Sequence, residues 1–328
     1  MNLGGPDKQS SVKPFLFNLF NDPAIINIIQ PFRFFIAKLI SSLREKKARG
    51  IYKLIGGGSP ILKLTEFQKK YLEKNLRKKG DYKCFIIMRY WNPRASDVYR
   101  DVLHYNPKEV ILLPLYPQFS TTTSGSSINE WKKVNKNNLK TKTICCYPND
   151  ENFINAHTKA IKKFLNRKSL SKTILLFSAH GLPKKIIDSG DPYQWQVEKT
   201  VEKIIKKLNL KNINFNICYQ SRVGPLKWIG PSTDDEIIKY SSQKFGIVLC
   251  PIAFVSEHSE TLVELDIEYK HLAKKSGALF FKRVPALGVN KDFIKCLTNL
   301  VLNKKSYGEK GLKPPFCNNS FEQCFCKS

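Results

Sequence analysis

Short apolar runs alternate along the chain with segments in which apolar residues recur every three or four positions. The first pattern is typical of strands buried in a parallel sheet, and the second is typical of amphipathic helices. The strands are expected at 84–90, 110–116, 143–147, 173–177, 213–218, 247–254 and 278–284, and the helices at 66–78, 96–104, 127–134, 153–165, 194–208, 233–244 and 291–303. This alternation predicts an α/β fold with two similar, doubly wound, Rossmann-like parallel-sheet halves and an active-site cleft between them.

The same pattern predicts how the chain is divided. We expect an N-terminal half at 1–118 and a C-terminal half at 119–288. A helix at 289–304 follows and is expected to pack back on the first half, and a cysteine-containing tail occupies 305–328.

Four glutamates follow the apolar strand at 247–254 at spacings of three, four and four residues, and they are Glu257, Glu260, Glu264 and Glu268. On a helix, these spacings place all four carboxylates on one face, where like charges destabilise the helix. No lysine lies on this stripe, although the chain is rich in lysine. Ligand sites of α/β proteins lie at the carboxyl ends of strands. The stripe therefore indicates a cation site or a route for protons or metal, and the alternative is an ordinary acidic helix face.

His180 follows the predicted strand at 173–177, in a Ser-Ala-His-Gly-Leu-Pro loop. A lone histidine is usually structural, but here a carboxylate stripe follows a strand of the same half. Imidazole and carboxylate together bind divalent transition metals or act as a base and a proton acceptor. His180 is therefore a candidate for either role.

Composition narrows the possible partners. The 328-residue chain has a net charge of +28, which fits nucleic acid, an anionic membrane surface or an acidic ligand. No zinc finger, RNP pattern or basic repeat supports nucleic acid, and the Lys, Ile, Asn and Phe content also fits a bias toward AT-rich codons. No apolar run reaches the ~18–20 residues of a membrane span. No signal peptide is visible and the cysteines are scattered, so we expect a cytoplasmic protein with reduced thiols.

Residues 14–40 form a strongly apolar segment that is interrupted by Pro14, Pro23 and Pro31 and contains many phenylalanines. The prolines predict short helices. The segment is either core, an exposed lip over a large flat ligand, or a membrane-docking surface, and residues 41–53 give it a basic flank.

Eight segments resemble motifs of the ferrochelatase family, bacterial type, in the family's order from residue 1 to about 302. They read MNLGGP, IGGGSP, MRYWNP, PLYPQFSTTTSGSS, FSAHGLP, GDPYQWQV, YQSRVGPLKWIGP and FVSEHSETLVELDIEY. The resemblance implies insertion of Fe²⁺, a substrate, into protoporphyrin IX with release of two protons, the last step of haem biosynthesis. It also implies that His180 and Glu260 are the catalytic and metal-binding pair. The acidic path would then comprise Glu257, His258, Glu264 and Glu268.

The resemblance further implies a π-type turn in the acidic helix. Candidate pocket walls for the porphyrin are Leu3, Tyr90 and Trp228, and candidate partners of the propionates are Arg89 and Ser127. Association with an anionic membrane surface would make the protein peripheral on the inner membrane.

The chain departs from the family in two places. Members with an iron–sulfur cluster have a cysteine where this chain has Thr121, and the three tail cysteines Cys317, Cys324 and Cys326 are one short of four ligands. We therefore expect no cluster. Members also have a strand before Asn2, whose loss would cost roughly 8–15 kcal/mol. We expect the reading frame to continue upstream of Met1 with an apolar run, and the 328-residue product to be poorly soluble or inactive.

Three alternatives stay open. A non-enzymatic haem or porphyrin carrier would need the aromatic pocket but not His180 together with Glu260. A coproporphyrin-type chelatase and a cobalt chelatase would keep both residues. The joint presence of the histidine and the carboxylate favours an enzyme.

Overall fold

The computed structural model describes residues 1–222, 224–303 and 320–327, which form two compact units. Unit 1 contains residues 1–146, 297–303 and 325–327, and unit 2 contains the rest. The sequence placed the boundary after residue 118, whereas the structure groups 119–146 with unit 1. This grouping has a physical reason, because the segment carries a helix that packs on unit 1 and a strand that pairs there.

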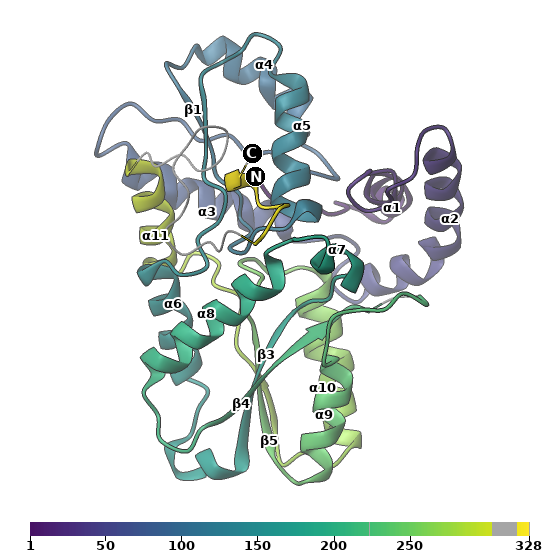
Figure 1. Cartoon of the computed structure of the whole chain (residues 1–328), viewed down its shortest axis with the longest axis vertical. Coiled ribbons are helices and arrows are strands. Elements are labelled where there is room, and N and C mark those ends of the chain that lie inside the picture. Colours follow the sequence, from purple (N-terminus) through teal and green to yellow (C-terminus); the bar gives the residue numbers. More distant parts are fainter. Residues whose placement is uncertain (223, 304–319, 328) are drawn as a thin grey trace. The chain divides into compact units, whose positions relative to one another are not determined.

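Unit 1 is mainly helical (Figure 1). Its helices are α1 (Val12–Phe20), α2 (Phe32–Lys53), α3 (Ile61–Leu76), α4 (Ala95–Tyr105) and α5 (Ser126–Val134), with a 3₁₀ turn η1 (Gln9–Ser11), a π-helical turn η2 (Thr121–Gly125) and a 3₁₀ turn η5 (Phe325–Lys327). Its strands are β1 (Val110–Leu112) and β2 (Thr141–Thr143), which pair in parallel. The strands expected at 110–116 and 143–147 are therefore shorter or shifted.

The strand expected at 84–90 is not formed, and this prediction was wrong. The segment makes only an isolated parallel bridge, Asn2 to Met88. A strand needs neighbours on its hydrogen-bonding edges. Instead, residues 82–87 line a cavity of about 690 Å³ together with residues 105–113 and the apolar side chains of α3.

Met1 lies at the edge of this cavity. Its amine donates a hydrogen bond to the Leu113 carbonyl oxygen at 2.8 Å, and its own carbonyl accepts one from the Leu115 N–H. Burial lowers the pKa of this amine to about 5, because the charged form is poorly solvated there.

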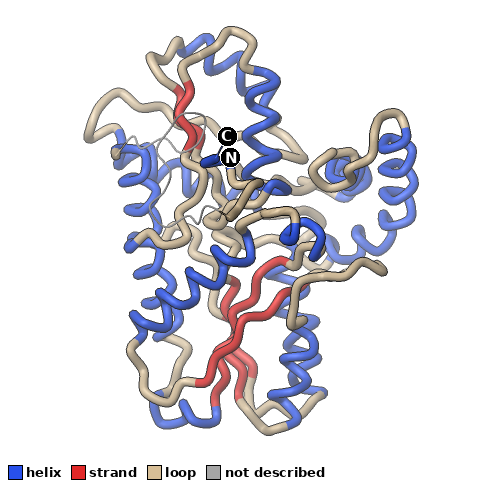
Figure 2. The backbone as a smooth tube through the Cα atoms, viewed as in Figure 1, coloured by secondary structure: helices blue, strands red, loops and turns tan. Residues whose placement is uncertain are grey.

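Unit 2 is built on a parallel sheet with the strand order β4-β3-β5-β6. Figure 2 shows the strands of this sheet in red. The strands are β3 (Thr173–His180), β4 (Asn214–Gln220), β5 (Gly246–Pro251) and β6 (Phe281–Arg283). The helices are α6 (Glu151–Lys162), α7 (Lys184–Asp188), α8 (Tyr193–Leu208), α9 (Thr233–Ser242) and α10 (Tyr269–Lys275), with a 3₁₀ turn η3 (Arg167–Lys172) and a π-helix η4 (Glu260–Glu268). The helix α11 (Lys291–Leu302) begins in unit 2 and continues in unit 1 from Leu297.

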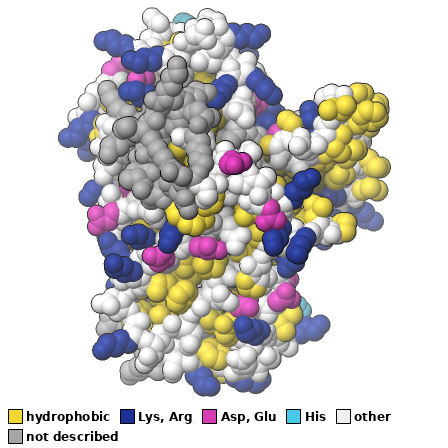
Figure 3. All heavy atoms as spheres, viewed as in Figure 1, with side chains coloured by type: hydrophobic (Ala, Val, Ile, Leu, Met, Phe, Trp, Pro, Cys, Tyr) yellow, Lys and Arg dark blue, Asp and Glu magenta, His cyan; other side chains and the backbone are white. Residues whose placement is uncertain are grey.

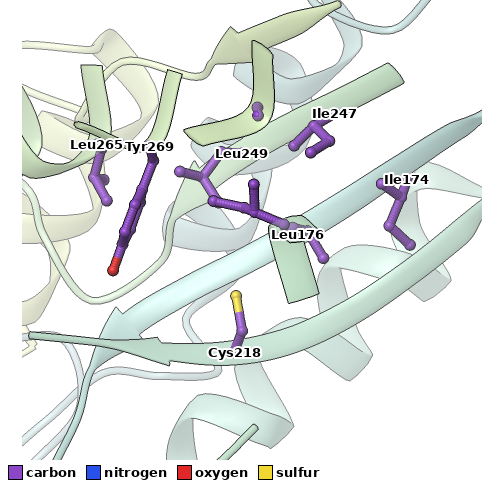
Figure 4. Packing of buried hydrophobic residues seen from close by; sticks show 9 residues of the cluster. Ile174, Leu176, Cys218, Ile247, Leu249, Leu265 and Tyr269 are labelled. Carbon is purple, nitrogen blue, oxygen red and sulfur yellow. The ribbon is translucent and has the colours of Figure 1, made fainter. Parts of the chain in front are cut away.

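Helices cover both faces of this sheet (Figure 1). Alternate strand residues such as Leu176 and Leu249 are fully buried and pack with Leu265 and Tyr269 from the π-helix and α10 (Figure 4). Because β3 and β5 are central and buried on both faces, their sequences read as continuous apolar runs. That is why both strands could be predicted from the sequence.

The apolar segment at 14–40 forms α1, a loop and the first part of α2. Pro14 sits in the first turn of α1, where proline is tolerated, whereas Pro23 and Pro31 lie in the connection to α2. The helix α2 is longer than expected and includes the basic flank. The most exposed apolar side chains of α2 and of the loop before it are Ile29 (74%), Leu43 (73%), Phe35 (62%), Phe32 (61%) and Leu39 (60%). They form the lip, a patch of hydrophobic side chains over this helix pair (Figure 3).

Candidate active site

His180 and Glu260 meet in unit 2. His180 is the last residue of β3, and Glu260 is the first residue of the π-helix η4. The Nδ1 atom of His180 lies 2.9 Å from Oε2 of Glu260. The His180 side chain is still 39% exposed, so the imidazole can meet a ligand.

The two groups set each other's protonation. Burial alone would lower the pKa of His180, but the Glu260 carboxylate outweighs it and raises that pKa above its ordinary value. Burial alone would raise the pKa of Glu260, but His180 and then His258 hold it well below its usual range. Each group therefore stabilises the charged form of the other.

The ends of β4 and the loop after it complete the surroundings of Glu260. Gln220 Nε2 donates to Glu260 Oε2 at 3.3 Å, and Ser221 Oγ lies 3.2 Å from the same oxygen. His258 Nε2 lies 3.7 Å from Glu260 Oε1. Ser221 has a left-handed backbone (φ 60°), which is uncommon for a residue with a side chain. Such strain often occurs at functional sites.

Glu264 is the second carboxylate of this group. It accepts hydrogen bonds from the Ser221 N–H at 2.9 Å and from Ser221 Oγ at 2.6 Å. Burial, and then the negative charge of Glu260, raise the pKa of Glu264. The neighbouring carboxylates thus differ, because the pKa of Glu260 is lowered and the pKa of Glu264 is raised.

The acidic stripe does not stay together as the spacing suggested. Glu257 is held by the Arg283 guanidinium at 2.7 Å and by the Ala286 N–H at 2.9 Å. Glu268 lies at the exposed end of the π-helix. The π-helix explains this separation, because its i→i+5 bonding turns successive glutamates away from one α-helical face. The implied π-type turn is confirmed.

The proposed propionate partner Arg89 is engaged within unit 1. Its guanidinium donates to the buried carboxylate of Asp22 at 2.8 Å and to Ser126 Oγ at 2.6 Å. Tyr90 also donates to Asp22 at 2.8 Å and is 1% exposed. The neighbour Ser127 is buried.

The last two pocket candidates lie in different units. In unit 1, Leu3 packs beside Tyr90 and accepts a hydrogen bond from its N–H. In unit 2, Trp228 makes an antiparallel bridge with Pro183. Its indole Nε1 is buried and has no hydrogen-bond partner among the described residues.

Sequence reasoning missed four residues of these networks, namely Asp22, Gln220, Ser221 and Tyr269. Asp22 carried a signal, since it is the only acidic residue in the apolar segment 14–40. Gln220, Ser221 and Tyr269 stood inside the motifs quoted above without being singled out.

The tail cysteines are partly described. Cys317 lies outside the described residues, and Cys324 and Cys326 are buried. Within unit 1, the sulfurs of Cys326 and Cys145 lie within 4.8 Å of each other. The sequence analysis did not count Cys145 with the tail.

The chain matches known proteins over nearly its whole length. The family model described as Ferrochelatase matches residues 1–305. A protein named Ferrochelatase from Pelagibacter ubique is 58% identical over 99% of this chain and 96% of its own length. Those of Rickettsia bellii and Rickettsia prowazekii are 52% and 49% identical over 99% of this chain and 93% and 96% of their own lengths.

A solved structure shares the fold. "SirB from Bacillus subtilis with Fe3+" matches with a TM-score of 0.54 at 12% identity, over 73% of this chain and 90% of that one. At this identity the likeness concerns the fold alone. The family match and the near full-length identities show that this chain belongs to the ferrochelatase family.

Proposed function

We propose that the protein inserts Fe²⁺ into protoporphyrin IX and releases two protons, as a chelatase of the lyase class. The observation that carries this proposal is the 2.9 Å contact between His180 and Glu260, with Glu264 nearby. Metallation of a porphyrin must remove two pyrrole protons. An imidazole that is partly exposed and backed by a carboxylate suits that task near neutral pH.

The residues have separate tasks in this proposal. His180 takes a pyrrole proton on its neutral imidazole, and Glu260 stabilises the imidazolium that forms. Glu260 and His180 also offer oxygen and nitrogen ligands to the incoming iron, which replace part of its water shell. Glu264 and His258 stand beside Glu260, whereas Glu257 is held by Arg283 and contributes to the position of the turn.

In this proposal, Leu3, Tyr90 and Trp228 provide apolar walls for the porphyrin. Arg89 and Ser127 were assigned to the propionates. Because Arg89 is already paired with Asp22, its electrostatic attraction for a propionate is weaker than that of an unpaired arginine.

Anaerobic incubation with Fe²⁺ tests the activity. We expect the metalloporphyrin spectrum to appear with protoporphyrin IX and to be much weaker with coproporphyrin, or with Co²⁺ in place of Fe²⁺. His180→Ala should abolish turnover and leave porphyrin binding, read by fluorescence quenching, largely unchanged. Glu260→Gln should do nearly the same, because it keeps the shape and removes the charge.

His271→Ala is the matched control, because His271 is an exposed histidine of the same unit. It should keep full activity. Near-native turnover by His180→Ala would show that the base is another group. A wild-type protein that binds porphyrin but never metallates it would favour the carrier instead.

We also propose that the protein is cytoplasmic and associates peripherally with an anionic membrane surface through the lip. No helix in the described part of the chain is long and apolar enough to cross a membrane. The exposed apolar side chains of α2 and the basic residues that follow them support this proposal.

The absence of an iron–sulfur cluster stays a prediction. It rested on Thr121 and on a count of three tail thiols, and Cys145 beside Cys326 is an additional thiol. Analysis of iron and acid-labile sulfide in anaerobically purified protein decides the matter. Near-zero sulfide is expected, and about two sulfides per chain would contradict the prediction.

A further inference from the structure

Glu264 has a partner on the side away from Glu260. Its Oε1 atom lies 3.0 Å from the hydroxyl oxygen of Tyr269, the first residue of α10. The Tyr269 ring is 3% exposed and packs beside Leu265 and Leu249, with its phenolic oxygen at the far end of the ring (Figure 4). A polar atom thus reaches Glu264 from within an apolar cluster.

The same hydroxyl reaches Asp234. The Tyr269 oxygen lies 3.2 Å from Asp234 Oδ2, and Asp234 is an exposed residue in the first turn of α9. A phenol carries one proton, so it cannot donate to two carboxylates at once. The arrangement is satisfied when Glu264 holds a proton and donates it to Tyr269, which donates its own proton to Asp234. The raised pKa of Glu264 supports that distribution.

Ser221 connects this group to the catalytic pair. Its Oγ atom lies 3.2 Å from Glu260 Oε2 and 2.6 Å from Glu264 Oε2. Hydrogen-bonding contacts therefore run from His180 through Glu260, Ser221, Glu264 and Tyr269 to the surface at Asp234. All six residues belong to unit 2.

We propose that Glu264, Tyr269 and Asp234 form the outlet for the protons that the porphyrin loses. Protons then leave the glutamate stripe at Glu264 and do not continue to Glu268. The inference rests on the proposed function. In this role, Tyr269 and Asp234 do not contact substrate or iron. They position Glu264 and restore its negative charge by taking up its proton.

Each transfer balances. Glu264 gives its proton to the Tyr269 oxygen while the phenolic proton passes to the Asp234 carboxylate, so one O–H bond forms for each one that breaks. Asp234 then loses the proton to water, and the negative charge is left on Glu264. Glu264 is thereby ready to accept the next proton through Ser221. No co-reactant other than water is needed.

Glu268 is not part of this chain of contacts. It lies exposed at the end of the π-helix, whereas Glu264 has its two oxygens occupied by Ser221 and Tyr269. Gln220 Nε2 also donates to Glu264 Oε2 at 3.4 Å, but its amide oxygen leads to the buried Ser178, whereas the contacts through Tyr269 lead to the exposed Asp234.

Tyr269→Phe tests the outlet, because it removes the hydroxyl and keeps the ring. We expect kcat for iron insertion to fall roughly tenfold with the KM values for porphyrin and Fe²⁺ unchanged, since proton transfer typically contributes 10²–10⁴-fold and water partly replaces the hydroxyl. Proton release, followed with a pH-indicator dye, should lag behind the metalloporphyrin spectrum. The solvent deuterium isotope effect on kcat should increase.

Tyr240→Phe is the matched control, because Tyr240 packs against the same apolar cluster. It should leave kcat, KM and proton release unchanged. Asp234→Asn is a second test that does not touch the core, and it should reproduce the lag, whereas Asp234→Glu should restore much of the rate.

A Tyr269→Phe protein with native kcat and no lag would overturn the inference alone. So would a loss confined to the KM for Fe²⁺, which would mean that these residues guide metal. A wild-type protein without chelatase activity would overturn the proposed function and this inference with it.

Discussion

The charge on His180 depends on Glu260, and this dependence can be measured without turnover. In the native protein, the carboxylate raises the pKa of the imidazole above its ordinary value of 6.5. In Glu260→Gln this carboxylate is lost and only the smaller effect of Glu264 opposes burial, so the His180 pKa should fall below that of the wild type. The neutral imidazole then persists to lower pH.

Nuclear magnetic resonance titration of ¹³C-labelled histidines checks this prediction. The exposed His271 serves as an internal reference, and its midpoint should be the same in both proteins. An unchanged His180 midpoint would mean that the 2.9 Å contact is not made in solution.

Asp22 supports another buried cluster, and its loss should destabilise unit 1. The carboxylate side chain is 2% exposed and accepts from Arg89, Tyr90 and Ser126. Removal of one partner of a buried ion pair costs about 3–5 kcal/mol. We expect the loss of stability in Asp22→Ala to lie near the lower end of this range. Glu130, which lies 3.6 Å from Arg89, still provides a negative partner for the guanidinium.

Urea unfolding gives the free energy for this comparison. Asp97→Ala is the control, since the Asp97 and Arg100 side chains are 52% and 81% exposed and lie 3.8 Å apart. Its effect should stay within about 0.5 kcal/mol. Equal stabilities for the two variants would show that the Asp22 cluster is not formed.

The helix pair that carries the lip should bind anionic vesicles reversibly. Its flank contains Arg44, Lys46, Lys47 and Arg49, and each basic residue near an anionic surface contributes ~1 kcal/mol. Arg49 contributes less, because it is paired with Glu45 at 2.8 Å. Co-sedimentation should therefore show binding that weakens as salt is added.

Phe32→Ser with Phe35→Ser should reduce this binding, since both side chains are more than 60% exposed. Phe67→Ser is a control on α3, where an exposed phenylalanine lies outside the lip. Equal binding to neutral and anionic vesicles at low salt would contradict the prediction.

Elements could be predicted where the sequence carried enough information by itself. The run at 173–177 covers most of β3 and the run at 247–254 covers most of β5, because strands buried on both faces must be largely apolar. The run at 84–90 looks the same but forms no strand, because pairing depends on neighbours and not on composition. The positions of His180 and Glu260 followed from strand ends. The roles of Asp22 and Ser221 did not, because their partners are distant in sequence.

At the scale of the whole molecule, we expect that filling the cavity beside Met1 would increase the stability of the protein. Met1–Leu3 bond on one side to residues 87–90 and on the other to residues 113–115, so a segment joined to the Met1 amine is directed into the cavity. It would convert a buried amine into an amide and bury apolar surface. An added apolar, β-branched segment of about five residues should therefore stabilise the protein and improve its solubility and activity.

Calorimetry checks this prediction, since each kcal/mol moves the Tm by about 2–4 °C in a protein of this size class. A Gly-Ser segment of the same length is the control, because it offers the amide but no apolar side chains. If both extensions gave the same Tm, the cavity would not accept a strand.

The proposed membrane association through the lip should also be sensitive to cold. Burial of its exposed phenylalanines and isoleucines is a hydrophobic contact, and such contacts weaken on cooling, whereas the attraction of lysine and arginine for anionic lipid does not depend on temperature in this way. On cooling, the electrostatic contribution to membrane binding would therefore remain, whereas the hydrophobic contribution would decrease. Organisms that live at low temperature would need either more basic residues or a larger lip to hold the same fraction at the surface.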